Sequence, residues 1–352
     1  MFAATPTAGA PTTSLRDRAE IAEVLSRYSQ GVDQRRWDLF ASAFAPGARI
    51  RMTLFPGRSY TAAEFRGFLA DGYDGVRLSG QHALANPLVT FADDQATSAV
   101  EFLATTLEAT GADGRTVRGT AAGLYLDRWT RTDAGWRIRE RLLVLKTLDE
   151  RPVEPAPALR DAILGTRDAF VATGPHTPIR FLEGDPMPLT PDDLAARAEI
   201  HDVLIAYCQA QDQELWSLWD RVFTPDATVR MPGVTDAAFT PDQLQGFLRQ
   251  FNATRVSGQH TVSNVLVDLD GDTARTVSEL TAVTLQTTDR EGVLKRSRSA
   301  GLYVDDFVRT DEGWRIRSRT TLQKLVEIDD VEYDPALIAT FALSKEHGFT
   351  ID

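Results

Sequence analysis

The amino-acid sequence predicts an α+β protein in which one domain occurs twice in tandem. Two observations support this prediction. Motifs of the first half return in the same order in the second half, and in each half helical periodicity is followed by segments typical of strands. The 352 residues are enough for two domains that each bury a core. A repeat of this length indicates a duplicated domain rather than a solenoid.

The repeat is visible in short motifs that keep their order. Ser-Gly-Gln-His, Ala-Gly-Leu-Tyr and Gly-Trp-Arg-Ile-Arg occur at residues 79–82, 122–125 and 135–139, and again at 257–260, 300–303 and 313–317. From the extent of these matches we expect the two domains at residues 14–173 and 193–352. The remaining segments are an expected disordered tail, 1–13, and a linker rich in Pro and Gly, 174–192.

Each copy is expected to begin with three helices. The first two carry apolar residues at helical spacings, and the third begins at a capping box, in which Thr is followed three residues later by Glu or Gln. In the first copy these residues are Ile21, Val24, Leu25 and Tyr28, then Trp37, Phe40 and Phe44, then Thr61 and Glu64. In the second copy they are Ile200, Val203, Leu204 and Tyr207, then Trp216, Trp219 and Phe223, then Thr240 and Gln243.

The rest of each copy is expected to form an antiparallel meander. In the first copy, residues 88–91, 97–107, 116–129 and 135–145 are rich in residues that favour strands, and turn residues separate them. Helices followed by a meander are typical of α+β domains. One curved sheet wrapped around the helices would leave a pocket between the two layers.

Composition excludes several classes of function. The formal net charge is −12, and an acidic surface repels phosphate backbones, so nucleic acid is not an expected partner. The single cysteine, Cys208, excludes an intramolecular disulfide and a cysteine zinc cage. No apolar run approaches the ~18 residues of a membrane span, and the N-terminal residues lack the features of a signal peptide. We therefore expect a cytoplasmic protein with no membrane partner.

Two histidines are the strongest candidates for catalysis. Of the five histidines, only His82 and His260 occupy the same position in both copies, and each is matched by an aspartate at the end of the first helix, Asp33 or Asp212. A carboxylate bonded to one ring nitrogen fixes the tautomer and raises the basicity of the other, as a general base requires. An Asp–His bond that only tethers a helix to a strand is the structural alternative, and the sequence leaves both open.

Further candidates lie near these pairs. The hydroxyls of Tyr28 and Tyr207 could assist a leaving oxygen, although their rings could equally complete the apolar stripe of the first helix. Arg141 and Arg319, on the last strand, could stabilise a departing anion, although a solvated strand face is the simpler interpretation. The other candidates for substrate contacts are aromatic residues of the repeated motifs, namely Trp37, Tyr125, Trp216 and Tyr303.

The sequence lacks the motifs that other kinds of catalytic or cofactor site require. The sequence contains no G-x-S-x-G nucleophile elbow, no G-x-x-x-x-G-K-[ST] phosphate loop and no G-x-G-x-x-G after a strand. One histidine per copy, with no second histidine or cysteine nearby, is a poor metal site. We expect neither a metal nor an organic cofactor. His201 has no counterpart in the first copy and is expected at the surface, while His176 and His347 fall in the linker and the tail.

The ordered motifs resemble the SnoaL-like branch of the NTF2-like superfamily. The resemblance is carried by the opening Arg-Ala-Glu-Ile helix, the Tyr-x4-Asp spacing, the Gln-His strand and the final Gly-Trp-Arg-Ile strand, each present in both copies. It implies two cone-shaped domains, each a curved antiparallel sheet around N-terminal helices with a deep apolar pocket. Because domains of this family often pair through their sheets, it also implies an internal pseudo-dimer, and it leaves further oligomers open.

The family includes scytalone and bile acid dehydratases, a dehydrochlorinase, polyketide cyclases, ketosteroid isomerases and non-catalytic binding subunits. The Asp33–His82 pair looks like the base dyad of its dehydratases and dehydrochlorinase. The resemblance therefore implies a cofactor-independent lyase acting on an apolar cyclic or aromatic small molecule. His82 and His260 would take a proton from carbon, and Asp33 and Asp212 would orient them. A cyclase or isomerase with the same base, and a non-catalytic binding protein, are the alternatives.

Overall fold

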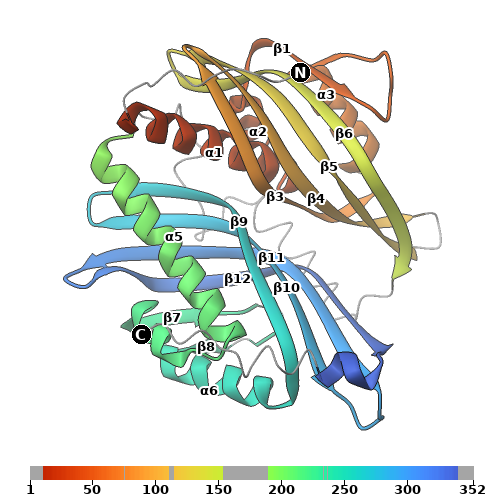
Figure 1. Ribbon diagram of the computed structural model, residues 1–352, viewed down its shortest axis with the longest axis vertical. Helices are drawn as coiled ribbons and strands as arrows, with labels where there is room; N and C mark the ends of the chain where they lie inside the picture. The colour runs from red at the N-terminus through yellow and green to blue at the C-terminus, as the bar shows by residue number, and fades with distance from the viewer. Residues whose placement is uncertain are drawn as a thin grey trace. The chain divides into compact units, whose positions relative to one another are not determined.

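The computed structural model describes residues 11–74, 76–110, 115–153, 189–232, 234–235 and 237–339. Its contacts divide the chain into two compact units, one containing residues 11–153 and the other containing residues 196–339 (Figure 1). Most of the expected tail and linker, together with His176 and His347, lies outside the described residues.

The first unit contains helices and one six-stranded sheet. Its helices are α1 (Pro11–Asp33), α2 (Trp37–Ser42) and α3 (Ala62–Leu69), and α3 continues into the π-helical turn η1 (Ala70–Asp74). Its strands are β1 (Phe44–Met52), β2 (Tyr60–Thr61), β3 (Arg77–Ala92), β4 (Gln95–Thr110), β5 (Arg115–Thr132) and β6 (Gly135–Val153).

The second unit repeats this order of elements. Its helices are α5 (Pro191–Asp212), the 3-10 helix η3 (Trp216–Arg221), α6 (Pro241–Phe251) and the 3-10 helix η4 (Asn252–Thr254). Its strands are β7 (Phe223–Arg230), β8 (Ala238–Phe239), β9 (Arg255–Asp270), β10 (Thr273–Thr287), β11 (Val293–Thr310) and β12 (Gly313–Glu332). The α+β class and the duplication are therefore confirmed.

Each unit has one six-stranded sheet, with the orders β2-β1-β6-β5-β4-β3 and β8-β7-β12-β11-β10-β9. The predicted meander is confirmed, because β3 to β6 and β9 to β12 pair in antiparallel fashion with their neighbours in sequence. Both capping boxes are also confirmed at the start of α3 and α6.

Two strands at one edge of each sheet, β1 with β2 and β7 with β8, were not predicted from the sequence. The second helix was expected to include Phe44 and Phe223, but each of these residues opens a strand that pairs in parallel with the last strand of its unit. Proline explains the change, since Pro46 and Pro225 disfavour helical geometry in the residue before them. The phenylalanine rings remain in the core after the helix has ended.

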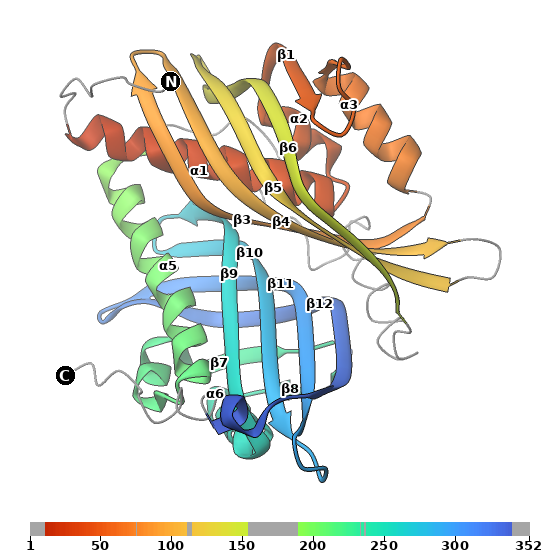
Figure 2. The ribbon, with the colours of Figure 1, turned by 45° about the vertical axis from the view of Figure 1, so that its right-hand side comes forward.

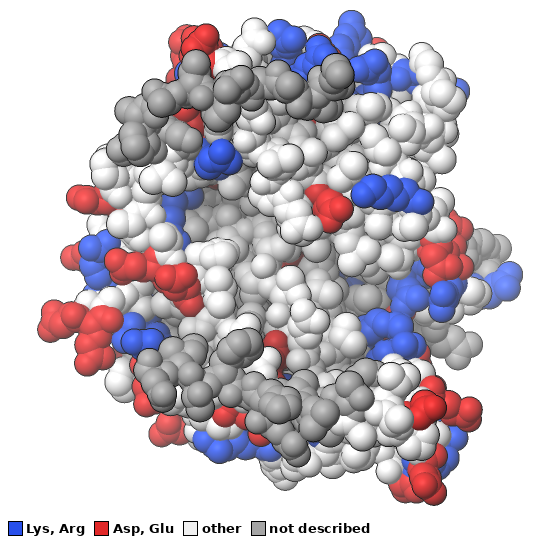
Figure 3. All heavy atoms as spheres, in the orientation of Figure 1, with Lys and Arg blue, Asp and Glu red and all other residues white. Residues whose placement is uncertain are grey.

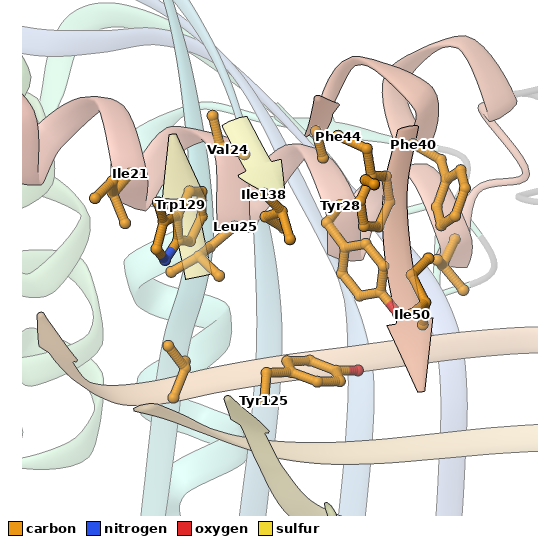
Figure 4. Close-up of a cluster of buried hydrophobic side chains, with 14 of the residues drawn as sticks. Ile21, Val24, Leu25, Tyr28, Phe40, Phe44, Ile50, Tyr125, Trp129 and Ile138 are labelled. Atoms are coloured by element: carbon orange, nitrogen blue, oxygen red, sulfur yellow. The ribbon is translucent and has the colours of Figure 1, made fainter. Parts of the chain in front are cut away.

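The core of the first unit lies between α1 and one face of its curved sheet (Figure 2). The predicted stripe of α1 is confirmed, because Ile21, Val24, Leu25 and Tyr28 are all buried. Figure 4 shows these side chains meeting aromatic and aliphatic residues from α2, β1, β5 and β6. Burying one such side chain stabilises the fold by about 1.5–3 kcal/mol.

The glycine of the repeated Ala-Gly-Leu-Tyr motif is explained by the close approach of a neighbouring strand. The register between β5 and β6 shifts next to Gly123, and the register between β11 and β12 shifts next to Gly301. A Cβ atom at these glycines would lie 2.1 Å from the carbonyl oxygen of Val144 and 2.3 Å from that of Leu322. Only glycine allows this approach, so the motif marks a bulge that bends the sheet.

Figure 3 shows acidic and basic side chains interspersed over one face of the molecule. Binding to a phosphate backbone draws on basic groups gathered on one face, and the charges on this face are mixed. Among the described residues, no helix is both long enough and apolar enough to span a membrane.

Candidate active site

In the first unit, Asp33 holds His82 through two contacts. Its Oδ2 accepts the backbone N–H of His82 at 2.6 Å, and its Oδ1 lies 2.5 Å from ring Nδ1. The carboxylate is fully buried, whereas 16% of the histidine side chain is exposed. An ionised carboxylate only accepts hydrogen bonds, so a neutral ring in this geometry carries its proton on Nδ1, and Nε2 is its basic nitrogen.

The second unit repeats this geometry. Asp212 accepts the backbone N–H of His260 at 2.6 Å, and its Oδ1 lies 2.6 Å from the Nδ1 of that ring. The exposed fraction of the His260 side chain is 14%. In both units the aspartate is the last residue of the first helix, as the sequence predicts, and the histidine lies within the first long strand of the sheet.

An arginine that was not predicted from the sequence fixes the end of the first helix in each unit. Arg77 is buried, and its Nη2 donates to the carbonyl oxygen of Val32 at 3.0 Å. Arg255 donates in the same way to the carbonyl oxygen of Gln211 at 2.6 Å. A cation at the C-terminus of a helix satisfies carbonyls that lack partners and opposes the helix dipole. Their position, five residues before each repeated histidine, was the available signal.

A cavity of about 220 Å³ lies in the first unit, and His82 forms part of its wall. Most of the wall is apolar and comes from α1, α3 and the inner face of the sheet. Its main apolar side chains are Val32, Phe65, Phe68, Phe102, Leu143 and Leu145, and its polar side chains include Tyr28, Thr106, Glu108, Tyr125 and Glu150. The site therefore combines one titratable histidine with surroundings that suit an apolar molecule.

Tyr28 and Tyr125 form an aromatic pair in the cavity wall, which we call the tyrosine pair. Their ring centroids are 5.4 Å apart in an edge-on arrangement, and Figure 4 shows both side chains. Burial raises the pKa of Tyr28 and raises that of Tyr125 well above its usual range. Both hydroxyls therefore stay protonated at neutral pH and can donate hydrogen bonds. Tyr207 and Tyr303 form the equivalent pair in the second unit, with the same direction of pKa change.

The arginines of the last strands are placed differently from the expectation. Arg141 was expected on a solvated strand face, but its side chain is fully buried, and its Nε and Nη2 donate to Asp127 at 2.7 and 2.6 Å. Its guanidinium carbon lies 4.1 Å from each ring of the tyrosine pair. Arg319 makes the same contacts with Asp305 and the second pair.

The solvated-face expectation failed because an aspartate lies directly opposite each arginine on the neighbouring strand. An ion pair of this kind allows a charged strand residue to be buried. Arg141 does not belong to the described residues that line the cavity, since it lies behind the tyrosine pair. An aspartate inside a strand, at the same place in both copies, was the signal that could have indicated this partner.

The remaining predicted residues lie in the helical layer or at the surface. Trp37 is half-buried, packs against Phe40 with ring centroids 5.9 Å apart, and does not line the cavity. Trp216 packs in the same way against Trp219 at 5.8 Å. His201 is exposed, as expected. In the described part of the chain, no group of three or more His, Cys, Asp or Glu side chains is arranged to hold a metal ion.

Comparison with protein families gives a match in each half of the chain. The model of the SnoaL-like domain family matches residues 13–142 and 192–320, which together make up more than half of the sequence. Uncharacterized protein Rv2910c of Mycobacterium tuberculosis is 36% identical over 130 residues, which cover 36% of this chain and 84% of that protein. Uncharacterized protein Mb2934c of Mycobacterium bovis matches with the same values.

Solved structures are similar to part of the chain. The Kfla4162 protein from Kribbella flavida is 23% identical, and the match covers 42% of this chain and 97% of that one with a TM-score of 0.35. The hexachlorocyclohexane dehydrochlorinase LinA-type3 from Novosphingobium barchaimii is 17% identical, and the match covers 41% and 95% with a TM-score of 0.35. Both matches extend over nearly the whole of the solved chain.

Proposed function

The chain belongs to the SnoaL-like domain family, with one domain in each half, and on this premise we propose that it is a cofactor-independent lyase. The proposed reaction removes water, or another small leaving group, from an apolar cyclic or aromatic molecule with an acidified C–H bond. The observation that carries the proposal is the Asp33–His82 pair in the wall of an apolar cavity, with its repeat at Asp212 and His260.

The proposed step begins at Nε2 of His82. This nitrogen takes a proton from carbon, the C–H electron pair forms a C=C bond, and the bond to the leaving oxygen breaks. The imidazolium lies against the carboxylate of Asp33, which stabilises its charge, and it returns the proton to the leaving hydroxide to give water. Positioned proton transfer of this kind contributes about 10²–10⁴-fold to a rate.

The tyrosine pair would stabilise the negative charge that develops on oxygen. Because burial keeps both hydroxyls protonated, each can donate a hydrogen bond to the leaving group or to a carbonyl oxygen. In this proposal Arg141 is a positioning residue, since it stacks on both rings and bonds to Asp127. Substrate contacts of Trp37 and Trp216 remain a prediction.

An isomerase is the second candidate, and the tyrosine pair is the observation that favours it. Two hydroxyls in the same cavity as a base could hold an enolate oxygen after the proton has left carbon. The two reactions share the first step and differ in the second. A lyase expels a leaving group, whereas an isomerase returns the proton to another carbon.

The test uses the full chain in deuterated buffer with 3-hydroxycyclohexanone and its benzo-fused analogue. Proton NMR follows both exchange next to the carbonyl and loss of water. We expect catalysed loss of water in the wild type and at least ~10²-fold slower turnover in a His82→Ala, His260→Ala double variant. His201→Ala, at an exposed histidine, is the control and should leave the rate unchanged.

Three outcomes would separate the alternatives. Full activity in the double variant would show that the Asp–His pairs are tethers and that the lyase proposal is wrong. Exchange without loss of water would favour the isomerase. A wild-type chain that catalyses neither exchange nor elimination would contradict the proposed chemistry for cyclic β-hydroxy ketones.

A further inference from the structure

The inner walls of the two units differ in polarity at equivalent positions. Residues that line the cavity of the first unit have counterparts in the second that can be identified from the repeat and the strand register. The pairs that change to uncharged polar side chains are Val32 and Gln211, Leu143 and Thr321, Leu145 and Gln323, Ala121 and Ser299, and Glu108 and Gln286, whereas Glu150 and Ile328 change in the opposite direction. Carbon-only side chains are thus replaced by amides and hydroxyls, and a carboxylate is replaced by a neutral amide.

The register of the strands supports these equivalences. Leu143 lies opposite Tyr125 across β5 and β6, and Thr321 lies opposite Tyr303 across β11 and β12. The position of Gln211 follows from the helix end, since it precedes Asp212 as Val32 precedes Asp33. The changed residues therefore occupy, in the second unit, the positions that line the cavity in the first.

At two places in the second unit, a buried polar atom has no hydrogen-bond partner among the described residues. Gln211 is 4% exposed, and its Nε2 has no partner among the described residues. Thr284 is 8% exposed, and its Oγ1 has no partner there either. In the first unit the equivalent Thr106 donates to Glu108 at 3.1 Å, but Gln286 replaces that carboxylate. A buried polar atom without a partner destabilises the fold, and a polar ligand or a water would supply the missing hydrogen bond.

We propose that the second unit binds a more hydroxylated molecule than the first. The first unit takes a largely apolar ring, whereas Gln211, Thr284 and Thr321 bind ring hydroxyls in the second. This inference rests on the proposed function only in taking both Asp–His pairs as parts of small-molecule sites. If it holds, the two domains of the chain bind different ligands, rather than being two copies of one binding site.

The test measures binding rather than turnover, so its outcome does not depend on the lyase proposal. The probes are 2-naphthol and 2,7-dihydroxynaphthalene, which differ by one hydroxyl, and isothermal titration calorimetry gives their dissociation constants. Ala104→Trp fills the first cavity, and Ala282→Trp fills the equivalent place in the second unit. Each variant leaves one site open.

With the first cavity filled, the diol should bind about tenfold more tightly than 2-naphthol, the scale of one buried hydrogen bond. With the second site filled, this preference should disappear or reverse. Adding Gln211→Val and Thr321→Leu to the Ala104→Trp chain should remove the preference for the diol. Thermal melts establish that each variant is folded.

Equal preferences in the two filled variants would overturn the proposal, and so would the absence of binding of both probes to the Ala104→Trp chain. If a filled variant does not fold, Gln211→Val and Thr321→Leu are introduced into the otherwise unaltered chain. These two substitutions should then weaken binding of the diol and leave the affinity for 2-naphthol unchanged. An unchanged affinity for the diol would again refute the inference.

Discussion

Replacing Asp33 with asparagine would test whether the Asp–His pair sets the protonation of the ring. In the structure, the two carboxylate oxygens accept two different groups of His82, the backbone N–H at 2.6 Å and ring Nδ1 at 2.5 Å. An asparagine side chain offers one oxygen acceptor and one NH₂ donor. When its oxygen accepts the backbone N–H, its NH₂ group faces Nδ1, which must then be the unprotonated nitrogen.

The consequence is a ring with the wrong tautomer. Nε2 would carry the proton and could not take another from carbon, so we expect turnover at this site to fall by about 10²–10⁴-fold. Both hydrogen bonds persist but are no longer made to a charged group, which costs about 1–2 kcal/mol of unfolding free energy. For a unit of this size, that cost lowers the melting temperature by roughly 2–8 °C.

The assay is elimination from 3-hydroxycyclohexanone in a His260→Ala background, so that only the first site contributes. Asp149→Asn is the control, because this carboxylate is exposed on β6 and is paired only with Arg151 in its described contacts. A variant that melts at the lower temperature but keeps the wild-type kcat would refute the reasoning and identify the pair as a tether.

Three further predictions concern packing and ionisation. Gly123→Ala should lower the unfolding free energy in urea by about 1–3 kcal/mol, because its Cβ would collide with a carbonyl oxygen. Gly67→Ala in α3, with open space around it, should instead raise the unfolding free energy by about 0.5–1 kcal/mol. Equal effects of the two substitutions would contradict the bulge argument. Arg141→Met should lower the unfolding free energy by about 3–5 kcal/mol, because it leaves the Asp127 carboxylate buried and unpaired. Adding Asp127→Leu should restore much of that free energy in the same assay, and no recovery would contradict this explanation. Because burial raises the pKa of both tyrosine pairs, the stability that they contribute is complete below about pH 10 and is lost as the pH rises further. Absorbance at 295 nm should therefore show four of the seven tyrosines ionising only when circular dichroism reports alkaline unfolding, and ordinary titration of all seven in the folded chain would refute this.

The sequence by itself determined the duplication, the helices of each copy, the antiparallel meander, and the partnership of Asp33 with His82. The helices and the meander depend on local information. Apolar spacing defines which face of a helix is buried, and a Thr–Glu or Thr–Gln spacing defines where α3 and α6 begin. The partnership spans 49 residues along the chain, and it could be predicted only because the duplication presents the same two residue types twice in the same order.

The tertiary structure alone decided the burial of Arg141, the parallel strand β1 and the role of Arg77. Each depends on which segment lies beside it. Arg141 is buried because the register of β5 and β6 places Asp127 opposite it, and Arg77 contacts the end of α1 because β3 passes that point. Sequence periodicity describes one element at a time, whereas the free energy of a buried charge depends on its partner across the fold. For that reason the chemistry of the cavity walls could be compared only once the strand register was known.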